Sequence, residues 1–93
     1  MAQLLTDDEI RSRLEGLEWQ RQGEEIVRDL RFADFTEAIA FVDRVADAAE
    51  EANHHPDIWV HGWNKVRLSL TNHSAGGLTD ADFELAGKIE TLT

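Results

Sequence analysis

Three of the four histidines of this chain lie in two short stretches that could carry proton-transfer chemistry. His54 and His55 directly precede the only proline, Pro56, and His73 directly precedes the stretch 74–77 with its glycine pair. An imidazole has an unperturbed pKa of about 6.5, so its acid and base forms are both populated near neutral pH. Histidines grouped in this way indicate either acid–base catalysis or metal binding.

Metal binding is the weaker of these two interpretations. No two histidines stand three or four residues apart, as they would on one face of a helix, and the chain has no cysteine. Two adjacent histidines rarely bind one ion together. We therefore predict no metal site.

Each histidine also has an ordinary structural explanation. The sequence His54-His55-Pro56 can be a solvated helix end, where a protonated imidazole favours the helix dipole. His73 can be a residue at the end of a strand that hydrogen-bonds to the following loop. Taken alone, the two stretches leave the structural and the chemical interpretation open.

Two acidic residues are ambiguous in the same way. Glu50 precedes His54 by four residues, which is one helical turn, so its carboxylate either orients the imidazole or is one more surface charge. Asp82 is the third residue after Thr79, and a helix-capping box explains it fully.

Helical and extended patterns alternate along the chain. A capping box that begins at Thr6 predicts a helix over residues 7–15, and the alternation from Trp19 to Phe32 around Gly23 predicts a hairpin of strands 17–21 and 26–32. Apolar residues at steps of three and four predict a second helix over 35–51. It should end before His55, because a residue before proline avoids the helical conformation.

The second half of the chain repeats this order. Alternation over residues 58–60 and 66–70, with a turn at Gly62 and Asn64, predicts a second hairpin, and Thr79 begins a third helix that continues through Ile89. The order α-β-β-α-β-β-α predicts an α+β fold in which three helices pack on one face of a four-stranded antiparallel sheet. We expect a single domain over residues 1–93, since a division of 93 residues into two domains would leave neither of them with a core.

The composition of the chain limits the classes of partner that it can bind. Nineteen acidic and nine basic side chains give a net charge of −10, which repels phosphate backbones and anionic lipid surfaces. We therefore expect no direct nucleic-acid partner and no membrane. The amino-terminal residues lack the pattern of a signal peptide, which predicts a cytoplasmic protein. A thin core and exposed sheet edges predict a homodimer or homotetramer.

An ordered series of motifs resembles the pterin-4a-carbinolamine dehydratase family, and the resemblance extends upstream through Trp19 to cover nearly the whole chain. The series consists of Glu50-x-x-x-His54-His55-Pro56-Asp57, Trp63-Asn64-Lys65-Val66-x-Leu68-x-Leu70-Thr71-x-His73 and Gly76-Gly77-Leu78-Thr79-x-x-Asp82. Any one fragment is weak evidence, whereas the ordered combination is specific.

The resemblance implies a reaction and the residues that carry it. The substrate is a 4a-hydroxytetrahydropterin, which loses water to give quinonoid dihydropterin and so returns the pterin to use after aromatic amino-acid hydroxylation. No cofactor is implied, because the pterin ring nitrogen supplies the electrons that expel hydroxide. By position, the catalytic residues are His54, His55 and His73, and the substrate-binding residues are Pro56, Trp19, Glu50 and Asp82.

The chain departs from the family pattern at three places. Ala81 stands where some members have arginine, Asn53 stands where aspartate is common, and the segment from Pro56 to Trp63 is one residue longer than in some members. A second function remains open, because some members act as non-catalytic dimeric binding modules, either as transcriptional coactivators or as assembly factors. A pure binding module has no physical need for all three histidines, so their joint presence favours the enzyme.

Overall fold

The computed structural model describes residues 3–93 and has the predicted order of elements. Its elements are α1 (Asp7–Leu14), β1 (Gln20–Gln22), β2 (Glu25–Arg31), α2 (Phe35–Ala52), β3 (Asp57–His61), β4 (Lys65–Leu70) and α3 (Asp80–Glu90). The strands form one antiparallel sheet in the order β1-β2-β4-β3. The predicted α+β class is confirmed.

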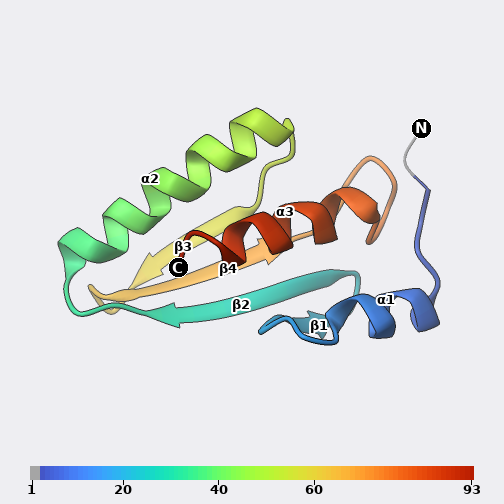
Figure 1. Ribbon diagram of the computed structural model, residues 1–93, viewed down its shortest axis with the longest axis horizontal. Helices are drawn as coiled ribbons and strands as arrows, with labels where there is room; N and C mark the ends of the chain where they lie inside the picture. The colour runs from blue at the N-terminus through green and yellow to red at the C-terminus, as the bar shows by residue number, and fades with distance from the viewer. Residues whose placement is uncertain (1–2) are drawn as a thin grey trace.

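One face of the sheet carries the hydrophobic core. Ile26 of β2 is paired with Leu70 of β4, and both are completely buried. Each helix adds a side chain to this core: Ile10 from α1, Phe41 from α2 and Ile89 from α3. Figure 1 shows α2 and α3 lying across the sheet, with α1 beside β1. The three helices therefore share one face, as predicted.

The alternate residues of β2, β3 and β4 point to the opposite face, which we call the open face. It carries Asp29 and Arg31 of β2, Trp59 and His61 of β3, and Lys65 and Arg67 of β4. Within residues 3–93 these six side chains are exposed or half-buried. Apart from Val27, which the alternation also directs to this face but which is only 4% exposed, the period-two pattern thus gives this face a charged and aromatic character.

The first strand is shorter than predicted and begins later. It spans Gln20–Gln22 rather than 17–21, because Leu17 still closes a turn onto the carbonyl oxygen of Leu14. Gly16 makes that turn with a φ of 81°, a conformation that glycine adopts without strain. The remaining predicted boundaries lie within one or two residues of the observed ones.

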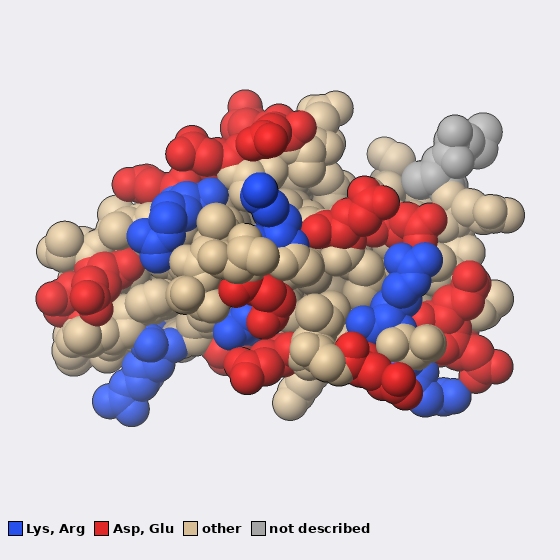
Figure 2. All heavy atoms as spheres, viewed as in Figure 1, with Lys and Arg blue, Asp and Glu red and all other residues tan. Residues whose placement is uncertain are grey.

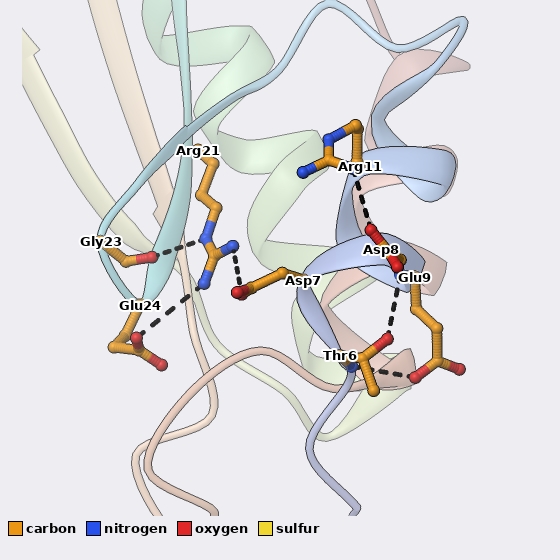
Figure 3. A network of polar contacts seen from close by, with 8 residues as sticks. All are labelled: Thr6, Asp7, Asp8, Glu9, Arg11, Arg21, Gly23 and Glu24. Atoms are coloured by element: carbon orange, nitrogen blue, oxygen red, sulfur yellow. Dashed lines mark hydrogen bonds and ion pairs between the residues drawn. The ribbon is translucent and has the colours of Figure 1, made fainter.

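Helix α1 is held to the first hairpin by a polar network that begins at its cap (Figure 3). The side chain of Thr6 accepts from the backbone N–H of Glu9, and the carboxylate of Glu9 accepts from the N–H of Thr6. Arg21 of β1 reaches Asp7 at 2.9 Å and also donates to the carbonyl oxygen of Gly23 at 2.8 Å. The capping box predicted from the sequence is confirmed.

A second polar cluster closes the carboxyl-terminal end of α3. Glu90 accepts from the indole Nε1 of Trp19 at 3.1 Å and from a guanidinium nitrogen of Arg28. Arg28 is only 8% exposed, and its second partner, Glu18, lies 3.3 Å away at the surface. The carboxylate of Glu90 therefore compensates a guanidinium buried against the sheet.

Acidic side chains gather along the outer side of α2 and around α1 in the view of Figure 2. None of the helices within residues 3–93 is both long and apolar enough to cross a bilayer.

Candidate active site

The three predicted catalytic histidines surround one hollow of about 230 Å³. One wall is Asn53, His54 and His55, at the end of α2, and the other is Thr71, Asn72, His73 and Ser74, after β4. Figure 1 shows the end of α2 and the β4–α3 loop at the same end of the sheet. Two segments separated in sequence by the β3–β4 hairpin thus converge here.

The first wall is shaped by an abrupt end of α2. Asn53 has left-handed backbone angles, φ 50° and ψ 41°, and its N–H still donates to the last helical turn. Asparagine adopts this conformation more readily than most residues, and it is a common residue just past a helix end. The N–H of His54 donates to the carbonyl oxygen of Ala49 at 3.1 Å, and Pro56 then starts the extended chain. The two histidines therefore lie outside the helix.

Asn72 organises the second wall. Its carbonyl oxygen accepts from the N–H groups of Ala75, Gly76 and Gly77 at 2.9–3.2 Å, and its side-chain oxygen accepts from Ala75 at 3.0 Å. This closes a tight loop that leaves His73 and Ser74 exposed at the hollow. Our sequence analysis missed Asn72, although an asparagine just before a glycine-rich loop is a known turn signal.

His54 is fixed by a buried carboxylate. Its Nε2 lies 2.5 Å from Oδ1 of Asp82, which is completely buried, while the imidazole itself is 14% exposed. The other oxygen, Oδ2, accepts from the N–H of Thr79 at 2.8 Å and from its hydroxyl at 3.3 Å. An ionised carboxylate only accepts, so a neutral His54 donates from Nε2 and keeps Nδ1 as an acceptor.

Asp82 therefore has the predicted capping contact and also a contact with His54 that the sequence did not predict. Oδ2 completes the capping box of α3 with Thr79, and Oδ1 orients His54. Thr79 is 2% exposed and also lies 3.5 Å from the amide nitrogen of Asn72. One buried cluster thus connects both walls of the hollow.

Glu50 pairs with His55 rather than with His54. Its Oε2 contacts Nε2 of His55, and both side chains are mostly exposed. The expectation from helical spacing fails here because the left-handed residue Asn53 interrupts the helix before His54. His55 is therefore held by a carboxylate that is in contact with water.

Trp19 is not brought to this hollow. Trp19 directly precedes β1, and its indole is buried in the core, where it donates to Glu90 at the far end of α3. Asp82 and Glu90 are eight residues apart on that helix, about 12 Å at 1.5 Å per residue. Pro56 directly precedes β3 and does not line the hollow.

A second hollow of about 240 Å³ lies between α2 and α3, and His54 lines it as well. Its wall includes Ala81, from the first turn of α3. The imidazole of His54 thus stands between two depressions. Only the first of them brings three imidazoles together, so that one is the candidate site.

The imidazoles and carboxylates around the hollow are not arranged as ligands of one metal ion. Within residues 3–93, no three histidine, aspartate or glutamate side chains come together as ligands for one ion. His54 and His55 each pair with a different carboxylate instead.

The fold and the site together define a small α+β domain with a histidine-lined hollow at one end of its sheet. A model of the family described as pterin 4 alpha carbinolamine dehydratase matches residues 3–92. Relatives from Acidobacterium capsulatum and Roseiflexus castenholzii are both 53% identical over 99% of this chain and 99% of their own length. Both carry the name pterin-4-alpha-carbinolamine dehydratase as a provisional assignment.

Two solved structures share the fold. A transcriptional coactivator/pterin dehydratase from Brucella melitensis is 34% identical with a TM-score of 0.89, over 95% of this chain and 96% of that one. A pterin dehydratase-like protein identified as a RuBisCO assembly factor in the alpha-carboxysome is 25% identical with a TM-score of 0.68, over 83% and 90%. This chain belongs to the pterin 4 alpha carbinolamine dehydratase family.

Proposed function

We propose that this protein dehydrates a 4a-hydroxytetrahydropterin to the quinonoid dihydropterin. The reaction breaks the bond between C4a and its hydroxyl oxygen and removes the proton from N5. It releases one water molecule and changes no oxidation state. It needs one group that gives a proton to the departing oxygen and one that accepts the proton from N5.

His54 is the proton acceptor in this proposal. Its Nε2 is occupied by the buried carboxylate of Asp82, which leaves Nδ1 free to accept. A carboxylate behind an imidazole holds the productive tautomer and stabilises the imidazolium that forms. This fixed pair beside the histidine-lined hollow is the observation that carries the proposal.

His55 and His73 are the candidates for the proton donor. Both are exposed at the same hollow, and each can exchange protons with water between turnovers. The two epimers of the substrate present their hydroxyl groups on opposite faces of the ring. Different histidines could serve the two epimers, which would account for retaining both.

The enzyme would act in pterin recycling, with the substrate supplied by a hydroxylase that uses tetrahydropterin. Membership of the family supports this role. A homodimer or homotetramer is part of the proposal, supported by the two sheet edges at β1 and β3. Static light scattering at micromolar concentration tests it, and a mass of only 10.5 kDa would contradict it.

The decisive experiment measures turnover of 4a-hydroxytetrahydropterin generated by a phenylalanine hydroxylase. We expect acceleration that is unchanged by a chelator. His54→Ala should lower kcat/KM by about 10²-fold or more, within the range for loss of a general acid or base.

His61→Ala is the matched control for this experiment, because His61 lies on the open face and does not line the hollow. It should change kcat/KM by less than about threefold. Absence of turnover by the native protein, or a larger loss for His61→Ala than for His54→Ala, would refute the proposal.

A further inference from the structure

The outward side of the β3–β4 hairpin is unusually aromatic and cationic. Trp59 and His61 of β3 and Lys65 and Arg67 of β4 face away from the core, whereas Ile58, Val60, Val66 and Leu68 belong to the covered face, and Trp63 lies in the turn between the strands. Trp59 is 58% exposed and Trp63 is 61% exposed. A strand face that meets only water needs no such side chains, so two exposed indoles on one hairpin call for an explanation.

The turn of this hairpin holds Trp63 outward in a costly conformation. Trp63 has a φ of 57°, in the left-handed region that bulky residues seldom adopt. Asn64 fixes the turn, because its side-chain amide donates to the carbonyl oxygen of Phe32 at 2.8 Å. Backbone strain of this kind is commonly found at binding sites.

A row of basic side chains crosses the open face beside the turn. Lys65 is the direct cross-strand neighbour of Arg31 on one side and of His61 on the other. Like charges directly opposite each other destabilise a sheet. Within residues 3–93, neither Arg31 nor Lys65 forms an ion pair, although the chain carries a net charge of −10.

The neighbouring row is arranged differently. Arg67 forms a two-pronged ion pair with Asp29, at 2.8 Å and 3.0 Å. Trp59, on the same row, stacks on His61 with ring centroids 4.1 Å apart and planes inclined by 20°. Between the rows lies a hollow of about 360 Å³ lined by Asp29, Leu30, Arg31, His61, Lys65 and Arg67.

We propose that this part of the open face docks an acidic segment of a partner polypeptide. Carboxylates of the segment pair with Arg31 and Lys65, and an apolar side chain packs on the stacked rings of Trp59 and His61. Tryptophan and arginine are the residues most enriched at the energetic centres of protein interfaces. Charge complementarity identifies the partner as acidic, since its carboxylates relieve the repulsion within the row.

A polypeptide suits this surface better than a nucleic acid does. A long polyphosphate extends beyond the basic row and is repelled by the net charge of −10. A short acidic segment interacts mainly with the cations next to it. The docking surface is also separate from the histidine hollow, because none of its residues lines that hollow. The inference therefore does not depend on the proposed dehydratase activity.

The test uses a fluorescent peptide of alternating glutamate and leucine, with a peptide of alternating lysine and leucine as its counterpart. We expect the acidic peptide to bind at least tenfold more tightly by fluorescence anisotropy, and more weakly as salt is raised. In spectra of nitrogen-15-labelled protein, the shifted signals should be those of residues 57–67 and Arg31.

Two double variants with the same change in charge locate the site. Arg31→Glu/Lys65→Glu should weaken binding of the acidic peptide at least tenfold. Arg11→Glu/Arg13→Glu removes two exposed cations of α1 and should change it less than twofold. Circular dichroism melting verifies that both variants are folded, and Trp59→Ala should weaken binding with the charges intact.

Several results would overturn the inference. They are equal losses for the two double variants, no preference for the acidic peptide, or spectral shifts that cluster on the helices. Competition by oligothymidylate at the same site would identify a nucleic-acid surface instead, and competition by inorganic phosphate a small-anion site. Light scattering that shows the charge reversal dissociating an oligomer would assign the surface to a second copy of this chain.

Discussion

The two ends of α3 each hold a carboxylate against a largely buried partner, but the partner is an imidazole at one end and a guanidinium at the other. At the amino-terminal end, Asp82 is completely buried and binds His54. At the carboxyl-terminal end, Glu90 binds Arg28 and the indole of Trp19. Both carboxylates satisfy donors that would otherwise be costly to bury.

The difference lies in the partner and in the access to it. A guanidinium keeps its proton at any ordinary pH, so Arg28 and Glu90 can only hold the sheet and the helix together. An imidazole can lose or gain a proton, and His54 lines two hollows. The same pairing geometry therefore stabilises the fold at one end and, in the proposed function, orients the base at the other. Four predictions test this contrast.

The largest expected effect concerns the stabilising end. Glu90→Ala leaves the guanidinium of Arg28, which is 8% exposed, without its closest carboxylate. Removing one partner of a buried ion pair typically costs 3–5 kcal/mol, and Glu90 is partly exposed, so we expect a loss of about 3 kcal/mol in the free energy of unfolding. Urea unfolding followed by circular dichroism measures it.

Glu18→Ala is the control at the same site. Glu18 is the exposed second partner of Arg28, and its loss should cost less than about 1 kcal/mol. The turnover number of the folded Glu90→Ala protein should remain within about twofold of the native value. A large loss of turnover at full folding would show that the two ends are not separate.

The next effect concerns the chemical end. Asp82→Asn keeps the size of the side chain, but its amide can donate to Nε2 of His54 and so favour the wrong tautomer. We expect kcat to fall about 10²-fold while KM stays within about threefold, because Asp82 does not line the hollow. Steady-state kinetics with 4a-hydroxytetrahydropterin separates the two parameters.

Asp80→Asn is the matched control for that prediction. Asp80 lies in the same first turn of α3 and pairs with Arg13 at the surface. Asp80→Asn removes the same negative charge from the first turn of α3 and should leave kcat unchanged. Equal effects of the two substitutions would mean that Asp82 acts only as a helix cap.

Much of the fold could be predicted because local pattern and tertiary structure agree. The capping box at Thr6 marks the start of α1, and burial along β4 alternates with the same period as its sequence. The shift of β1 could not be predicted, since a three-residue strand has too few positions for a pattern. Its pairing with β2 decides its limits.

The candidate site could be predicted in its residue types but not in its pairings. The three histidines were expected together, and they line one hollow. The carboxylate partners of the histidines could not be predicted. Glu50 contacts His55 because Asn53 adopts a left-handed conformation, and helical spacing does not predict that conformation. Trp19 was expected near the pocket, but the long-range bond to Glu90 places its indole at the other end of α3.

A smaller effect is expected for the second imidazole–carboxylate pair. Glu50→Gln removes the charge beside His55, but both side chains are largely exposed to water. Water replaces the lost hydrogen bond and screens the lost charge, so kcat/KM should fall by no more than about threefold. A loss as large as that for Asp82→Asn would make His55, rather than His54, the base.

The smallest effect should come from Asp29 on the open face, whose ion pair is the exposed counterpart of the two at α3. The hydrogen bond from Arg67 is the main cause that lowers the pKa of Asp29 below its usual 3.8. A lowered folded pKa means that the pair contributes stability above about pH 4 and that this contribution disappears as the pH falls through the folded pKa. Asp29→Asn should therefore be slightly less stable than the native protein at pH 7, and the difference should shrink as the pH falls below about 4. Urea unfolding over this pH range at low salt measures the difference, because salt screens an exposed pair. A difference that stays constant down to pH 2 would mean that the charge of Asp29 is not what Arg67 stabilises.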